Sequence, residues 1–168
     1  MHRASFVGRR RGRESVVGCM STTTTSITSI LNSLIETCKD GQEGFNAAAE
    51  AVNDVDYKSL FVELSMQRQQ FATELQALVV ALGAQPEDSG SVSAALHRGW
   101  LDLKAAIAQG KPHAILEECE RGEDSAVAAY REALEHENIP ANILELLERQ
   151  FMGVQAAHDR VRTLRDRT

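Results

Sequence analysis

The sequence contains few aromatic residues and prolines, and it has no long apolar run. Aromatic residues make up 5% of its 168 residues, and there are 3 prolines. This composition favours helices over sheets, because helix interiors exclude proline and strands are enriched in aromatic side chains. No apolar run approaches the roughly 18 residues that a membrane span needs, so we expect no membrane partner. The length predicts one domain with a substantial core.

Several kinds of chemistry lack their usual sequence signals. The three cysteines, Cys19, Cys38 and Cys119, have neither metal-binding nor redox spacing. Cys38 and Cys119 fall on apolar seams, where they are predicted to be small buried side chains in a protein of the reducing cytoplasm. There is no Gly-x-Ser-x-Gly motif and no phosphate-binding glycine loop. The net charge of −6 disfavours a nucleic-acid partner.

Residues 1–20 differ from the rest of the chain. They carry five arginines and no periodic apolar positions, and no apolar stretch follows the arginines as a secretory signal would require. We interpret them as a disordered basic tail or a misassigned start before Met20, in preference to an anion-binding arm. Residues 21–168 then form the folded domain.

Four long segments have apolar residues at alternating steps of three and four, the spacing of packed helices. They cover about residues 26–52, 56–82, 112–137 and 141–164. Short turns join the first helix to the second and the third to the fourth, so each pair is predicted to be antiparallel. Residues 83–111 form a long crossover with a short extra helix over residues 91–109. The predicted fold is an all-α, ferritin-like antiparallel four-helix bundle.

Three of the four seams are interrupted by an ionisable residue, namely Arg68, Glu123 or His158. Burying such groups is costly unless they are paired or bind a metal. At 1.5 Å per residue, the three positions fall within roughly 6 Å of one level, and Gly41 leaves room there on the first helix. The sequence therefore predicts one buried polar layer, made of Gln67, Arg68, Glu120, Glu123, Gln155 and His158.

Four segments carry a resemblance to a known family. In chain order they read DGQEGF from Asp40, LHRGW from Leu96, ECERGED from Glu118 and AHDRVR from Ala157. Together they resemble the bacterial ferritin-like bundle family known as domain of unknown function 2383, over about Ser26 to Asp166. The resemblance implies the fold and a distant kinship to ferritins, and it implies no established activity.

Ferritin-like di-iron proteins place a Glu on each of two helices and Glu-x-x-His on each of the other two. This chain matches that pattern only in part, because Gln155 replaces the carboxylate before His158 and Arg68 stands where a ligand should be. A fixed cation opposes the binding of two metal ions and can instead pair with carboxylates.

We therefore consider three possible functions. We favour a non-enzymatic bundle without a cofactor, in which an Arg–Glu–His network replaces the di-iron centre; a stress-related role would rest on kinship alone. The alternatives are a site for iron, manganese or zinc formed by Glu120, Glu123 and His158, and a site for a small polar or anionic ligand held by Arg68 and His158.

The crossover motif contains His97, Arg98 and Trp100, the only tryptophan. We interpret Trp100 as an anchor of the crossover against the core, with a partner groove as the functional alternative. Self-association as a homo-oligomer is plausible for a ferritin-like bundle, but the sequence does not identify the interface.

Overall fold

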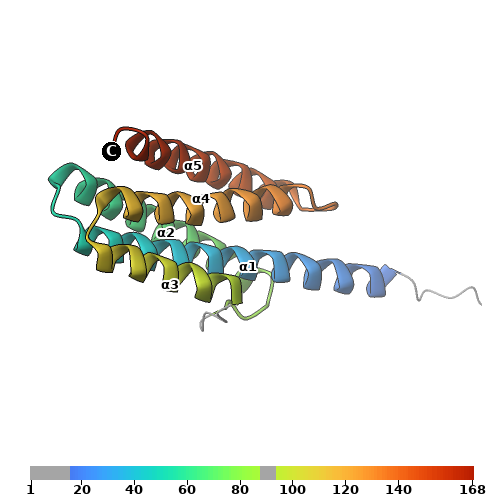
Figure 1. Ribbon diagram of the computed structural model, residues 1–168. Coiled ribbons are helices and arrows are strands. Elements are labelled where there is room, and N and C mark those ends of the chain that lie inside the picture. Colours follow the sequence, from blue (N-terminus) through green and yellow to red (C-terminus); the bar gives the residue numbers. More distant parts are fainter. Residues whose placement is uncertain (1–15, 88–93) are drawn as a thin grey trace, which may run out of the picture.

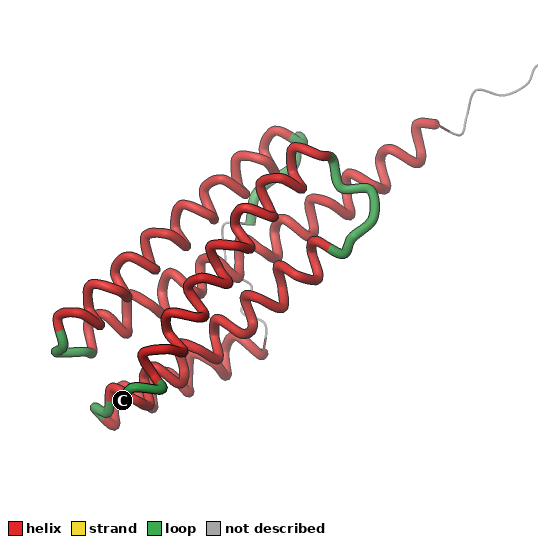
Figure 2. Tube along the Cα trace, turned by 90° about the horizontal axis from the view of Figure 1, so that it is seen from above, coloured by secondary structure: helices red, strands yellow, loops and turns green. Residues whose placement is uncertain are grey.

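The structure is a computed structural model that describes residues 16–87 and 94–168, and these residues contain helices and no strand. The four long helices are α1 (Val16–Ala51), α2 (Val55–Ala81), α4 (Pro112–Leu134) and α5 (Ala141–Arg165), and the shorter α3 (Ala94–Gln109) lies between α2 and α4 in the chain. None of the helices in the described ranges is long and apolar enough to cross a membrane. Figure 2 shows the long helices running side by side, with short loops between them.

The helix order gives the predicted crossover topology. α1 packs against α2, and α4 packs against α5. α2 and α4 run in the same direction, because the chain returns along the bundle through α3 before α4 begins (Figure 1). α3 lies against α1 and α4. The predicted all-α four-helix bundle with an extra crossover helix is therefore confirmed.

Local sequence explains where several helices begin and end. The Asp54 side chain accepts hydrogen bonds from the backbone N–H groups of Asp56 and Tyr57, at 2.9 and 3.1 Å, and so caps the start of α2. Gly83, with φ of 77°, follows the end of α2, where the left-handed conformation suits glycine. Pro112 opens α4, as proline does without losing a helical hydrogen bond.

Two predicted boundaries differ from the structure. α1 begins at Val16, so residues 16–20 of the predicted tail are helical, whereas residues 1–15 lie outside the described residues. α4 ends at Leu134, and Glu137 is exposed beyond it. Asn138 has φ of 65°, a value that breaks the helix before Pro140. Residues 135–137 therefore lie beyond the end of the helix that the sequence predicts over residues 112–137.

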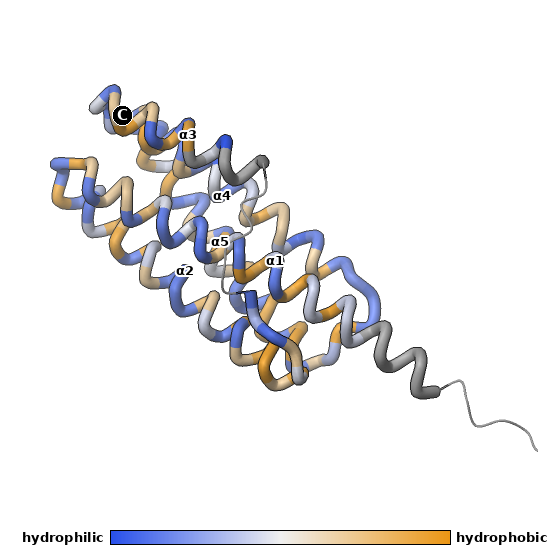
Figure 3. Tube along the Cα trace, turned by 90° about the horizontal axis from the view of Figure 1, so that it is seen from below, coloured by the Kyte–Doolittle hydropathy of each residue, from blue (hydrophilic) through white to orange (hydrophobic). Residues whose placement is uncertain are grey.

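The core consists of two apolar clusters arranged along the bundle. One contains Leu31, Leu75 and Leu147, and the other contains Phe45, Phe61 and Leu116. On α1, α2 and α4 the clusters are separated by the segments that carry Gly41, Arg68 and Glu123, respectively. Figure 3 shows apolar and polar residues sharing each helix. The buried polar side chains therefore lie between two apolar clusters and are held in place by both.

Candidate functional site: a buried ion pair between two apolar clusters

The centre of the bundle is an ion pair between Arg68 on α2 and Glu123 on α4. Arg68 is 1% exposed and Glu123 is 2% exposed. The Arg68 guanidinium donates a hydrogen bond to the Glu123 carboxylate, with Nη2 and Oε2 2.5 Å apart. This contact links two helices that run in the same direction, belong to different antiparallel pairs and do not pack against each other directly, so the two long side chains meet across the centre of the bundle.

The surroundings of Arg68 are shaped to hold a long cationic side chain. A Cβ atom at Gly41 would lie 3.3 Å from the Arg68 Cγ and Cδ atoms, so the glycine on α1 leaves the space that the arginine stem occupies. The guanidinium carbon lies 5.7 Å from the Phe71 ring centroid, within the range of a cation–π interaction. Gln67 accepts a second hydrogen bond from the guanidinium, at 3.2 Å. The role predicted for Gly41 agrees with this geometry.

Glu120 lies one turn before Glu123 but has a different partner. Its carboxylate forms an ion pair with Arg165, at the end of α5, with 2.5 Å between Nη1 and Oε2. We predicted from the sequence that Glu120 belongs to the same polar layer as Arg68. The structure instead ties it to the C-terminal end of the bundle, because the long Arg165 side chain reaches back to it.

His158 also forms a separate set of contacts. Its Nε2 lies 3.0 Å from the Asp124 carboxylate on α4, and its Nδ1 lies 2.9 Å from the carboxylate of its neighbour Asp159. Gln155 donates to the same Asp159 carboxylate at 3.3 Å. The His158 side chain is only 11% exposed, but both aspartate side chains are 65% exposed, so a buried ring directs its two nitrogens toward the rim of the bundle.

The predicted single layer is therefore divided. Gln67, Arg68 and Glu123 meet in the core, whereas Glu120 pairs with Arg165, and Gln155 and His158 belong to an aspartate cluster at the rim. The expected Arg–Glu–His network is corrected to an Arg–Glu pair, with the histidine outside its hydrogen bonds. These residues lie at similar levels along the helix axes, which is why one layer was predicted. Their side-chain rotamers and the nearby aspartates determine which groups form hydrogen bonds.

The environment shifts several pKa values. Burial raises the pKa of the Glu123 carboxyl, and the positive charge of Arg68 acts against this rise. For His158, burial acts to lower the pKa, but the hydrogen bonds to Asp159 and Asp124 outweigh it and raise the pKa overall. A histidine whose two ring nitrogens both face carboxylates is stabilised in its protonated form.

A second buried network was missed in the sequence. Tyr130 donates a hydrogen bond to the Gln150 side-chain oxygen at 2.8 Å, and its hydroxyl lies 3.2 Å from the Cys38 sulfur. Gln150, which is fully buried, donates from its side-chain nitrogen to the Glu74 carboxylate at 2.8 Å. Arg149 pairs with the same carboxylate at 3.2 Å. Polar contacts thus run from the core thiol to the surface between α2 and α5.

One sequence signal could have revealed this network. Gln150 lies three residues after Leu147 and four before Val154, which is the spacing of the buried face of α5. The large apolar residues Leu144 and Phe151 are also spaced for one face of α5, but both are only half-buried. Gln150 is therefore a buried polar residue beside a bulky apolar one that is less buried, and it is absent from the predicted polar layer.

The crossover motif carries no described site. Arg98 is exposed on α3, while the side chains of His97 and Trp100 lie outside the described residues.

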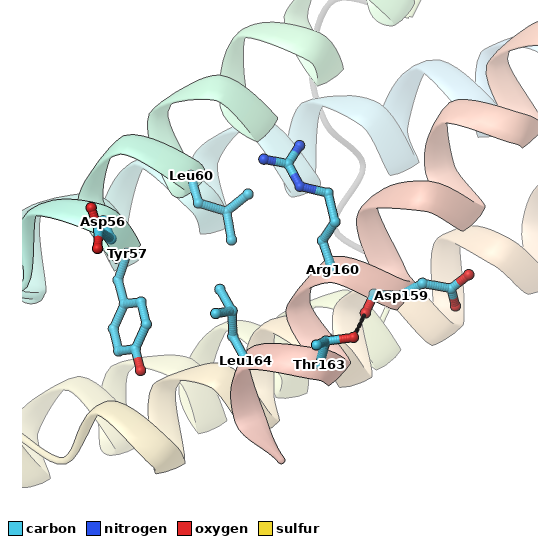
Figure 4. Close-up of a pocket in the computed structure, with 7 residues that line it drawn as sticks. All are labelled: Asp56, Tyr57, Leu60, Asp159, Arg160, Thr163 and Leu164. Carbon is cyan, nitrogen blue, oxygen red and sulfur yellow. Dashed lines mark hydrogen bonds between the residues drawn. The ribbon is translucent and has the colours of Figure 1, made fainter. Parts of the chain in front are cut away.

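A separate open groove of about 440 Å³ lies between the start of α2 and the end of α5. Its lining includes Tyr57, Leu60, Arg160 and Leu164, as Figure 4 shows, and it contains neither Arg68 nor His158.

These side chains do not fit the di-metal centre that a ferritin-like fold implies. Glu123 and Glu120 each have an arginine partner, and His158 directs both ring nitrogens at aspartates. A guanidinium fixed between the helices would repel divalent cations. Among the described residues, no group of three or more His, Cys, Asp or Glu side chains is arranged to hold a metal ion.

The fold and the buried centre define a ferritin-like four-helix bundle with an ion pair in its core. A Dps1 mutant from Mycobacterium smegmatis has a similar structure, with a TM-score of 0.67, 12% sequence identity, and coverage of 84% of this chain and 96% of that chain. The family model for Domain of unknown function (DUF2383) matches residues 26–136, more than half of the chain, and the chain therefore belongs to this family. No curated protein gives a significant match.

Proposed function

We propose that this protein is a non-enzymatic ferritin-like bundle that carries an Arg68–Glu123 ion pair in place of a metal centre. The observation that supports the proposal is the burial of that pair between the two apolar clusters, with Glu123 bound to a guanidinium. An ion pair in this position sets the register of the diagonal helices α2 and α4, as buried polar groups do in some helical assemblies. The protein then acts through its helical surface and not through a reaction centre.

The supporting argument is electrostatic. Two metal ions in a ferritin-type centre need several carboxylates whose negative charge is not already neutralised. Here the carboxylates of Glu120 and Glu123 each pair with an arginine, and the chain offers an amide, Gln155, before its histidine. A site for an anionic ligand on Arg68 would likewise require Glu123 to be displaced from a buried contact.

We propose that the protein resides in the cytoplasm, because Cys38 and Cys119 are free and buried.

The proposal is tested by metal analysis of protein purified without a tag. We expect less than about 0.1 equivalents of iron, manganese or zinc per chain, and a melting temperature that does not change when these ions are added, because a bound ion would stabilise the fold. The matched variant is His158→Ala, which removes the metal ligand that the alternative function requires. A stoichiometric metal content that disappears in His158→Ala would replace the proposal with the metal-binding function.

A further inference from the structure

The outer face of α2 carries a second seam, which is exposed. Eight positions at steps of four and three residues lie on this face, and all are uncharged and exposed: Val55, Ser59, Val62, Met66, Gln69, Thr73, Ala77 and Val80. Val55, Met66 and Val80 are 78, 65 and 60% exposed, which is high for large apolar side chains. We call these eight residues the outer seam.

The charges of α2 lie away from the outer seam along most of its length. Arg68 points into the core, while Glu63 and Glu74 pair with the α5 residues Arg160 and Arg149. The remaining charged residues, Asp56 and Lys58, lie in the first turns of the helix. α2 packs against α1 and α5, and the outer seam faces away from both. An uncharged stripe thus runs along one helix of a chain in which 25% of residues are charged.

The spacing indicates what kind of partner would cover this stripe. Apolar and small residues that recur at steps of three and four residues are typical of a helix that packs against another helix. This spacing keeps one stripe facing the partner helix over several turns. Six of the eight positions also correspond when the outer seam is reversed, Val55 to Val80, Val62 to Thr73 and Met66 to Gln69, whereas Ser59 and Ala77 are offset by one residue. A two-fold symmetric contact requires this kind of self-complementary surface.

We propose that the outer seam is the contact surface for a second copy of this chain, whose α2 runs antiparallel to the first. The two-fold axis then passes between Met66 and Gln69. Two chains that each carry a net charge of −6 repel one another, and the outer seam lets them approach along a stripe where no like charges face each other. This inference is independent of the proposed metal-free core.

The area of the outer seam limits the strength of the contact. From Val55 to Val80 the helix is about 39 Å long, and a stripe about 10 Å wide gives roughly 400 Å² per copy. The total of roughly 800 Å² is below the 1,200 Å² or more that stable complexes bury, although the rims of α1 and α5 can add to it. We therefore expect a reversible dimer with a dissociation constant in the micromolar range.

The first test is sedimentation equilibrium of the full chain from about 1 to about 300 µM, a range that brackets such an affinity. Wild type is expected to shift from monomer to dimer, and Met66→Glu to remain monomeric with an unchanged melting temperature. Met152→Glu is the matched control, because Met152 is 72% exposed on α5, and it should dimerise like wild type. A wild-type monomer throughout, or loss of the dimer in Met152→Glu but not in Met66→Glu, overturns the proposal.

The second test distinguishes the orientation of the two helices. In a Cys19→Ser background, Gln69→Cys places a thiol beside the two-fold axis and should form a disulfide-linked dimer under mild oxidation. Val55→Cys should not, because the two copies of that residue would lie about 38 Å apart along the helices. Cross-linking of Val55→Cys would indicate a parallel contact, in which every seam residue faces its own copy, and would contradict the assignment whatever Gln69→Cys does.

Discussion

Replacing Arg68 by leucine is expected to destabilise the protein by about 3 kcal/mol, because it leaves the Glu123 carboxylate without its cation. Glu123 is 2% exposed, so water cannot take the place of the guanidinium. Breaking one side of a buried ion pair costs about 3–5 kcal/mol, and leucine recovers part of this by filling apolar space beside Phe71. The measurement is the free energy of unfolding, from urea denaturation followed by circular dichroism at pH 7.

A double-mutant cycle separates the charge pair from the loss of packing. Glu123→Leu should also cost about 3 kcal/mol, since it leaves a buried guanidinium unpaired, whereas the double variant Arg68→Leu/Glu123→Leu should lie within about 1–2 kcal/mol of wild type. The two single costs would then exceed the cost of the double variant by several kcal/mol. Additive single effects, each below about 1 kcal/mol, would refute the claim that the pair is buried and mutually dependent.

The pH dependence of Arg68→Leu provides an internal check. Burial raises the pKa of Glu123, and without Arg68 nothing of comparable size opposes that rise. A carboxyl whose pKa is higher in the folded than in the unfolded state binds more protons when folded, so stability falls as pH rises above about 4.3, the unfolded value, toward the folded pKa. The destabilisation caused by Arg68→Leu should therefore be smaller at pH 5 than at pH 7. A loss of equal size at both pH values would contradict the assignment of a stranded carboxylate.

Two further predictions concern the other polar groups. Tyr130→Phe should destabilise the protein by about 1–3 kcal/mol in the same urea assay, because it leaves the Gln150 oxygen buried without its donor. The control is Tyr57→Phe, at the half-buried groove, which should change the free energy of unfolding by close to zero. Equal effects of the two substitutions would argue against the buried network. For His158, burial acts to lower the pKa, but Asp159 and Asp124 raise it overall, so the stabilisation is present below about pH 6.5 and is lost as pH rises through the folded pKa. The free energy of unfolding should therefore fall more between pH 6 and pH 9 in wild type than in His158→Gln, and identical pH profiles would contradict this.

The inward faces of α1 and α2 could be predicted from the sequence, because their apolar residues repeat without ambiguity. Leu31, Leu34, Cys38 and Phe45 are all buried as the steps of three and four require. The crossover was also predictable, since a loop and a short helix separate α2 from α4. Burial of Arg68 and Glu123 followed from their positions on these faces. The fold and the ion pair are thus encoded in local periodicity.

The division of the polar residues could not be predicted in this way. Helix geometry gives a residue's level along the helix axis and its approximate face. It does not give the bonding partner of a long side chain, which can reach groups several ångströms away. Arg165 reaches Glu120 from the end of α5, and exposed aspartates attract His158 to the rim. Gln150 was missed because Phe151, one residue further on, is a stronger apolar signal for the same turn of helix. Such choices depend on rotamers and on residues from three different helices.

The most direct measurement of the central claim is a crystal structure of the full chain with anomalous data, from crystals soaked in iron, manganese and zinc salts. We expect continuous density for the Arg68 guanidinium against the Glu123 carboxylate, and no anomalous peak between α2, α4 and α5. An anomalous peak coordinated by Glu120, Glu123 and His158, with Arg68 turned away, would contradict it.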